Sequence, residues 1–147
     1  MNPDVVTVAI KGVMPTANGC AVFLGDDHKT FVIYVDHSVG NAIQMSLKGE
    51  KKERPLTHDL LKNVITTFDA RLVQVEIIAL REKIFYGNLV LEKDSEIIRV
   101  DSRPTDAIAM AVRAHIPILV DPNVMASAGI LPEEDMQVES EKTDSIE

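Results

Sequence analysis

The alternation of apolar and polar residues divides the first quarter of the chain into short strands. Residues 5–13 alternate and are rich in β-branched side chains, the pattern of a half-buried strand. Two more strands are expected at residues 20–24 and 30–35, separated by turns at 15–19 and 25–29 that contain Pro, Asn, Gly and Asp. These three strands are predicted to form an antiparallel meander.

Two helices are expected next, because the apolar residues change to a helical spacing. Ser38 is a suitable N-cap for a helix that runs to about residue 48, and Gly49 is a suitable C-terminal stop. Thr57 is the predicted N-cap of a second helix that runs to about residue 68. This second helix is expected to bury one apolar stripe, made of Leu60, Leu61, Val64, Ile65 and Phe68.

The second half of the chain repeats the change from strands to a helix. Strands are expected at residues 70–80, 84–91 and 97–101, followed by a mostly buried helix that begins at Pro104. A short strand at 116–120 and a short helix at 121–129 complete the pattern. Runs of strands between runs of helices predict an α+β fold with an antiparallel or mixed sheet in the order βββ-αα-βββ-α-β-α, with the helices packed on the sheet.

Composition narrows the class of protein. A chain of 147 residues, of which 46% are hydrophobic, suits one globular domain. The single cysteine, Cys20, excludes an intramolecular disulfide framework and is expected to be a small core residue. No apolar run approaches the ~20 residues of a transmembrane helix, and no signal peptide is recognisable. The sequence therefore predicts a cytoplasmic protein without a membrane partner.

The acidity of the chain belongs to its C-terminal end. Of the formal net charge of −8, residues 132–147 carry −6 and the rest of the chain carries −2. The chain is therefore predicted to consist of a folded domain at residues 1–131 and an acidic, disordered tail at 132–147. A nearly neutral domain lacks the overall basic character of a dedicated nucleic-acid-binding protein.

Two Arg-Pro corners hold an unusual density of polar side chains: Arg54, His58 and Asp59 at one, and Asp101, Arg103 and Asp106 at the other. Carboxylates are hard oxygen ligands for Mg²⁺ or Mn²⁺. Arginine offers a planar fork to phosphate oxygens, and histidine transfers protons near neutral pH. Together these groups would suit a metal-assisted phosphodiesterase, if the two corners meet in space.

The same corners also have a purely structural interpretation. A carboxylate in the first turn of a helix is stabilised by the helix dipole, by ~0.3–1 kcal/mol. Arg103 would then pair with Asp101 or Asp59, and His58 would be a partly buried hydrogen-bonding residue. The residues taken alone favour capping over catalysis. The sequence contains no glycine-rich phosphate loop, no Cys/His zinc spacing and no Gly-x-Ser-x-Gly elbow.

Three blocks of the sequence resemble the bifunctional nuclease family. They are Arg-Pro-Leu-Thr-His-Asp-Leu-Leu at 54–61, Phe-Tyr-Gly at 85–87, and Asp-Ser-Arg-Pro-Thr-Asp-Ala-Ile-Ala at 101–109. The resemblance covers about residues 5–130. It implies an α+β domain, a homodimer, and nuclease activity on DNA and RNA. Family members commonly carry a glutamate at the start of the first helix, where this chain has Val39.

The preferred hypothesis is a nuclease that hydrolyses phosphodiester bonds of DNA, RNA or both, with a divalent metal and no organic cofactor. The expected metal ligands are Asp59, Asp101 and Asp106, with His58 completing the catalytic set and Arg54 and Arg103 binding the substrate. The alternative is a non-catalytic homodimeric module that uses the same corners to bind an anion or a partner. A further alternative is an accessory domain that acts through a partner.

Overall fold

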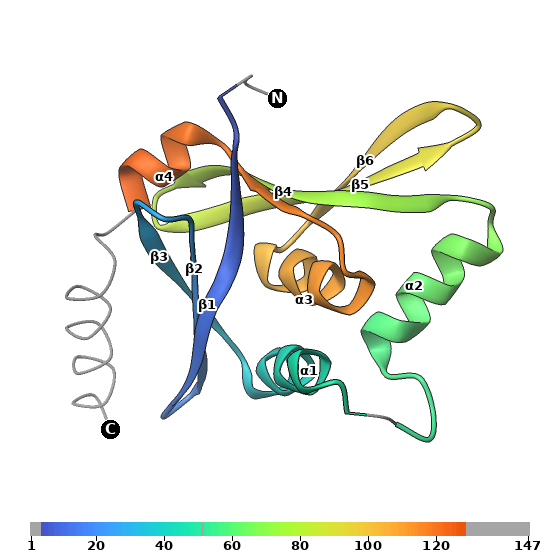
Figure 1. Ribbon diagram of the computed structural model, residues 1–147, viewed down its shortest axis with the longest axis horizontal. Helices are drawn as coiled ribbons and strands as arrows, with labels where there is room; N and C mark the ends of the chain where they lie inside the picture. The colour runs from blue at the N-terminus through green and yellow to red at the C-terminus, as the bar shows by residue number, and fades with distance from the viewer. Residues whose placement is uncertain (1–3, 51, 129–147) are drawn as a thin grey trace.

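The computed structural model describes residues 4–50 and 52–128. The elements follow the expected order and form an α+β fold around a seven-stranded mixed sheet (Figure 1). The strands are β1 (Val6–Thr16), β2 (Gly19–Gly25), β3 (Thr30–Val35), β4 (Arg71–Arg81), β5 (Ile84–Lys93), β6 (Glu96–Ser102) and β7 (Ile118–Val120). The helices are α1 (His37–Lys48), α2 (Thr57–Thr67), α3 (Pro104–Ala114) and α4 (Pro122–Ala128).

The sheet joins the two halves of the chain through the short strand β7. The strand order is β3-β2-β1-β7-β4-β5-β6. Strand β7 pairs antiparallel with β1 and parallel with β4, and the other neighbouring pairs are antiparallel. In Figure 1, β1–β3 run steeply across the direction of β4–β6, so the sheet is strongly twisted. The predicted fold class and the predicted meander are confirmed.

Helix α3 is the central helix of the structure. It packs against α1, α2 and strands β4 and β5, and lies on the same side of β4–β6 as the other two helices (Figure 1). Residues 107–111 are all buried, which confirms the predicted burial of this helix. The core around it is aliphatic, with fully buried side chains that include Val22, Leu24, Ile43, Val75, Ile77, Ile108 and Met110. Helix α4 contacts β4 and β3.

The start of the first helix corrects the sequence prediction. The N-cap is Asp36, not Ser38, and the Asp36 Oδ1 atom accepts a hydrogen bond of 2.8 Å from the Val39 backbone N–H. An aspartate there satisfies one of the unpaired N–H groups of the first turn. Gly49 ends the helix with a φ of 68°, as predicted. Val39, at the position where the family resemblance implies a glutamate, is buried in the core.

The second helix corrects the sequence prediction more strongly. Its N-cap is Leu56, not Thr57, and of its predicted buried stripe only Ile65 is buried. The other four apolar side chains of that stripe are exposed: Leu60, Leu61, Val64 and Phe68. The apolar residues of α2 do recur at helical spacing. However, α2 contacts the rest of the structure mainly through α3 and β4, and these two elements cover only part of its apolar face. An amphipathic pattern shows which side chains share a helix face, and it cannot show what covers that face.

Smaller differences concern turns and termini. Pro15 belongs to β1 and pairs with Cys20, so the expected five-residue turn shortens to Ala17 and Asn18. Cys20 is buried, as predicted, and burial raises the pKa of its thiol. None of the helices in the described part of the chain is long and apolar enough to cross a membrane. The predicted acidic tail at 132–147 lies outside the described residues.

Candidate functional site

The turn from β6 into α3 places the second polar corner at the start of a buried helix. Pro104 occupies the first helical position, and Asp106 lies in the first turn, as predicted. The Asp106 side chain does not cap the helix, because the Arg103 Nε–H donates to its Oδ2 atom at 2.7 Å. Arg103 is mostly exposed, so its charge faces solvent beside the carboxylate. This geometry holds an arginine and an aspartate together at the surface.

The first polar corner meets the second one through His58. The His58 Nε2 atom lies 3.1 Å from the Asp106 Oδ1 atom, and this contact joins the first turn of α2 to the first turn of α3. The side chain of His58 is 14% exposed and that of Asp106 is 31% exposed, so the pair is shielded but not closed off from solvent. The two corners therefore converge in space, at a contact between residues 48 positions apart.

Asp106 is ionised at neutral pH. Partial burial by itself raises the pKa of this carboxyl. The hydrogen bonds from Arg103 and His58 outweigh that effect and hold the pKa of Asp106 below its ordinary value. Asp106 in turn raises the pKa of the Arg103 guanidinium, and nearby Asp36 adds to this effect. The charge of the Arg103 guanidinium is therefore favoured by two carboxylates, of which Asp106 makes the direct contact.

The charge on Asp106 fixes which nitrogen of His58 can act as a base. An ionised carboxylate only accepts hydrogen bonds, so the Nε2 atom of His58 carries the hydrogen. In the neutral imidazole, the lone pair then lies on Nδ1. A histidine oriented by a carboxylate in this way is the usual arrangement of a general base.

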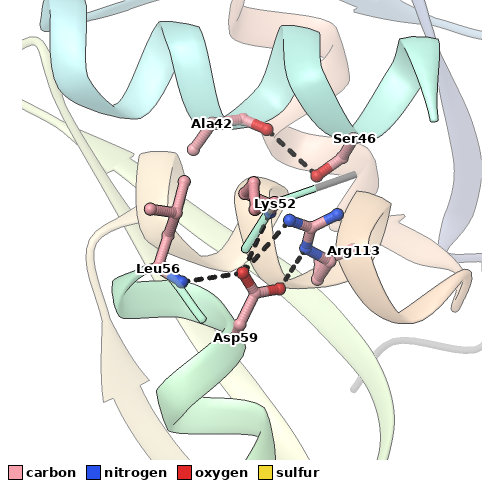
Figure 2. A network of polar contacts seen from close by, with 6 residues as sticks. All are labelled: Ala42, Ser46, Lys52, Leu56, Asp59 and Arg113. Atoms are coloured by element: carbon pink, nitrogen blue, oxygen red, sulfur yellow. Dashed lines mark hydrogen bonds and ion pairs between the residues drawn. The ribbon is translucent and has the colours of Figure 1, made fainter. Parts of the chain in front are cut away.

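Asp59, the neighbour of His58, is held in a separate ion cluster (Figure 2). Its Oδ2 atom accepts hydrogen bonds from Lys52 Nζ at 2.9 Å, from the Leu56 N–H at 2.9 Å and from Arg113 Nη2 at 3.1 Å. Arg113 also pairs with Asp59 through its Nε atom. This cluster ties the start of α2 to the last turn of α3 and to the segment before α2. Its geometry is that of a structural link.

Lys52 and Arg113 were not singled out by sequence reasoning. Lys52 lies in a segment that looked like a solvated connector, and Arg113 looked like an ordinary cation in the last turn of a helix. No spacing relates either residue to Asp59, which is 54 positions from Arg113. A signal for this cluster exists only in the packing of α2 on α3.

Arg54 lies near the Asp59 cluster and not at the His58–Asp106 contact. It lines an open hollow of about 400 Å³ together with Lys52, Arg113, Glu50 and Glu53. This lining mixes basic and acidic side chains in similar numbers, so the hollow is not a strongly basic cradle. Arg54 and Arg103 thus belong to two neighbouring sites. Arg54 shares its site with Asp59, and Arg103 shares its site with His58 through Asp106.

Asp101 is directed away from α3. It pairs with Asn88 on β5, and paired residues of antiparallel strands share one face of a sheet. Gly87, the residue before Asn88, faces α3, since a side-chain carbon there would lie 3.4 Å from the Pro104 Cα atom. Successive side chains alternate between faces, so Asp101 lies on the other face of the sheet. The structure does not bring Asp101 to the His58–Asp106 contact.

The three aspartates that were expected to bind a metal therefore have three different surroundings. Asp59 is paired with Lys52 and Arg113, Asp106 is paired with Arg103 and His58, and Asp101 lies on the opposite face of the sheet. Among the described residues, no three His, Cys, Asp or Glu side chains are grouped so that they could hold a metal ion. Metal binding by these residues stays a prediction, and no chemical step below depends on it.

The fold and the convergent corners define an α+β domain with a shielded His-Asp pair, and sequence comparison assigns the family. The profile of the bifunctional nuclease domain matches residues 22–133. The chain therefore belongs to the bifunctional nuclease domain family. The matched range includes both polar corners and the sheet edge between them.

Two curated relatives, both from Mycobacterium tuberculosis, are similar to this chain. They are the uncharacterized proteins MT1877 (strain CDC 1551 / Oshkosh) and Rv1829 (strain ATCC 25618 / H37Rv). Each is 37% identical over 99 residues, which is 67% of this chain and 58% of the relative. The match thus spans little more than half the length of these relatives.

Proposed function

We propose that this protein hydrolyses phosphodiester bonds of DNA, RNA or both. The observation that carries the proposal is the His58–Asp106 contact, which joins the family's two polar blocks into one site. Folding brings a base, an orienting carboxylate and an exposed arginine together at the start of a buried helix. If the two corners only capped their own helices, a contact between the His58 and Asp106 side chains would not be required.

Each side chain of the site has a role that follows from its chemistry. His58 would accept a proton from the attacking water through Nδ1, because Nε2 is occupied by Asp106. Asp106 would act as a positioning residue that holds the imidazole in this tautomer and stabilises its protonated form. Arg103 is mostly exposed and permanently charged, so it would bind the phosphate next to the pair.

A divalent metal would stabilise the charge of the phosphate and activate water if one binds with the substrate. Because Asp59 and Asp106 are already paired with cations, the described residues offer no ready set of ligands, and the substrate's own oxygens would have to contribute. Arg54, in the neighbouring hollow, would contact the substrate further along its backbone. A cytoplasmic location stays a prediction.

The test compares purified variants on single-stranded DNA and RNA, with Mg²⁺, with Mn²⁺ and with EDTA. His58→Ala and Asp106→Asn are expected to lower kcat by about 10²–10⁴-fold, the usual contribution of general acid–base catalysis. Asp106→Asn should also alter the pH profile of kcat, since it changes how the imidazole is held. Arg103→Ala is expected to raise KM. The matched control is His28→Ala, because His28 is an exposed histidine in the turn between β2 and β3.

The same experiment separates catalysis from a structural role. Asp59→Asn breaks the ion cluster and should lower the unfolding temperature, with activity falling only as far as folding does. If His58→Ala and Asp106→Asn keep full activity, the measured nuclease is a contaminant and the proposal fails. If they lose activity only in proportion to stability, the non-catalytic binding module becomes the better explanation.

A further inference from the structure

The carboxylate of Asp106 holds a histidine and an arginine side by side. Its Oδ1 atom lies 3.1 Å from His58 Nε2, and its Oδ2 atom lies 2.7 Å from Arg103 Nε. Because both oxygens belong to one carboxylate, the imidazole and the guanidinium are close neighbours. A phosphodiester group bound by Arg103 therefore lies beside the His58 base.

The carboxylates near this site do not fit the divalent metal that the sequence led us to expect. Both oxygens of Asp106 accept hydrogen bonds from side chains, and Asp59 is paired with Lys52 and Arg113. A metal ion would have to displace these contacts and would lie next to the cations that make them, which is unfavourable. Asp101 lies on the other face of the sheet. The described residues therefore contribute a base and a cation to the chemistry.

A base and a cation are sufficient for cleavage when the nucleophile is already part of the substrate. In RNA, the 2′-hydroxyl belongs to the same ribose as the 3′-oxygen of the phosphodiester, whereas DNA lacks this group. A nucleophile held in this way has an effective concentration of up to about 10⁵–10⁸ M, so no separate water has to be bound and aligned. A base beside the phosphate is also beside the 2′-hydroxyl. The site therefore suits the internal nucleophile of RNA.

We propose that the His58–Asp106 site cleaves RNA by attack of its own 2′-hydroxyl, with no metal ion, and leaves a 2′,3′-cyclic phosphate. This inference rests on the nuclease function proposed above. It adds the identity of the nucleophile, the chemical form of the new ends and the independence from metal.

The step balances without a second reactant. The Nδ1 atom of His58 takes the proton of the 2′-hydroxyl, the 2′-oxygen bonds to phosphorus, and the bond from phosphorus to the 5′-oxygen breaks. The 5′-oxygen leaves with the electron pair of that bond and takes a proton from water, and His58 returns its own proton to the solvent. Arg103 stabilises the charge that develops on the phosphate oxygens. Asp106 stabilises the imidazolium while it exists.

The same site treats DNA differently. Without a 2′-hydroxyl, a water molecule has to attack, and its activation then depends on a divalent metal that binds together with the substrate. EDTA therefore separates the two activities. Cleavage of RNA is expected to persist in EDTA, and cleavage of DNA is expected to be lost.

The first test changes the substrate and leaves the protein intact. Wild-type protein in EDTA is incubated with a single-stranded DNA that contains one ribonucleotide. Cleavage is expected only after that ribonucleotide, with a 2′,3′-cyclic phosphate on one fragment and a 5′-hydroxyl on the other, both identified by mass spectrometry. A matched strand with a 2′-O-methyl group at this position is expected to be cut at least about 100-fold more slowly, because the blocked oxygen cannot attack.

The second test changes the protein and keeps the ribonucleotide substrate. His58→Ala is expected to lower the rate by about 10²–10⁴-fold, and imidazole added to the solution should restore part of it by replacing the missing base. A purely structural role of His58 predicts no such rescue. His28→Ala, a change of an exposed histidine in a turn, is the control that should keep the full rate.

The outcomes separate this inference from the nuclease function on which it rests. Equal cleavage of the 2′-O-methyl strand, or RNA cleavage that stops in EDTA and returns with Mg²⁺, overturns the inference and leaves the nuclease function standing. Cyclic-phosphate ends formed equally fast by His58→Ala come from a contaminating ribonuclease and also overturn it. If neither RNA nor DNA is cut, with or without metal, both proposals fail.

Discussion

At the scale of single residues, the site depends on two residues that are adjacent in the sequence but whose side chains contact opposite ends of α3. His58 and Asp59 are adjacent in the first turn of α2, yet His58 contacts the start of α3 and Asp59 contacts its end. The first contact joins a base to an ionised carboxylate, and the second neutralises a carboxylate with two cations. One sequence block thus supplies both a candidate catalytic residue and a structural link.

The ionisation of Asp106 predicts how stability depends on pH. A carboxyl whose pKa is lower in the folded protein stabilises the fold at pH values above its ordinary pKa of about 3.9, and this contribution is lost as the pH falls through the folded value. Asp106→Asn is expected to be less stable than the wild type by about 1 kcal/mol at pH 7. The difference should narrow as the pH falls from about 4, where the carboxyl of the unfolded chain takes up a proton, through the lower pKa of the folded protein.

Urea unfolding of both proteins at pH 7, 5 and 3 measures this difference. Arg103→Gln is the informative companion, because it removes the donor that contributes most to the low pKa of Asp106. In that variant, the contribution of Asp106 to stability should be smaller at pH 7. A difference between Asp106→Asn and the wild type that stays constant from pH 7 to pH 3 would contradict the assignment.

At the scale of elements, the structure shows how far a periodic pattern can be interpreted. The spacing of apolar residues located α1, α2 and α3 to within a few residues. It did not show that α2 buries one apolar residue and exposes four, because burial depends on which elements pack nearby. The caps of α1 and α2 were each misplaced by one or two residues for a related reason. At α1, Asp36 and Ser38 could both cap, and the backbone geometry selects Asp36, whereas α2 begins after Leu56, whose side chain cannot accept a hydrogen bond.

The N-cap of α1 gives a direct test at this scale. Asp36→Ala removes the hydrogen bond to the Val39 N–H and is expected to lower the free energy of unfolding by about 1 kcal/mol. This corresponds to a loss of roughly 4 °C in Tm. Ser38→Ala, the matched change at the residue first expected to cap, should stay within about 0.5 kcal/mol of the wild type. Equal losses in the two variants, measured by calorimetry, would contradict the observed cap.

At the scale of the whole molecule, the uneven distribution of charge along the chain bears on what it can bind. The homodimer that the family resemblance implies stays a prediction. The net charge of −8 is concentrated in residues 132–147, which lie outside the described part of the chain. A nucleic acid that approaches the His58–Asp106 site carries negative charge, so these residues should oppose its binding electrostatically.

Removal of residues 132–147 is therefore expected to raise the affinity for single-stranded nucleic acid. The gain should be largest at low salt and should shrink as salt screens the tail. The matched control keeps the length but replaces the seven acidic residues of this segment by Asn and Gln, and it should behave like the truncation. Fluorescence anisotropy at several salt concentrations gives the measurement. An affinity and a salt slope unchanged by truncation would exclude this role.

The sequence by itself determined the α+β class, the order of strands and helices, the buried nature of α3 and the two polar blocks that mark the family. These features are local, since they follow from the spacing of apolar residues and from turn and cap chemistry within a few positions. Only the tertiary structure decided that His58 contacts Asp106 and that Arg113 forms an ion pair with Asp59. It also decided that Asp101 lies on the face of the sheet opposite α3. Those outcomes join or separate residues about fifty positions apart. They depend on how α2 packs on α3 and on strand register, which no local pattern encodes.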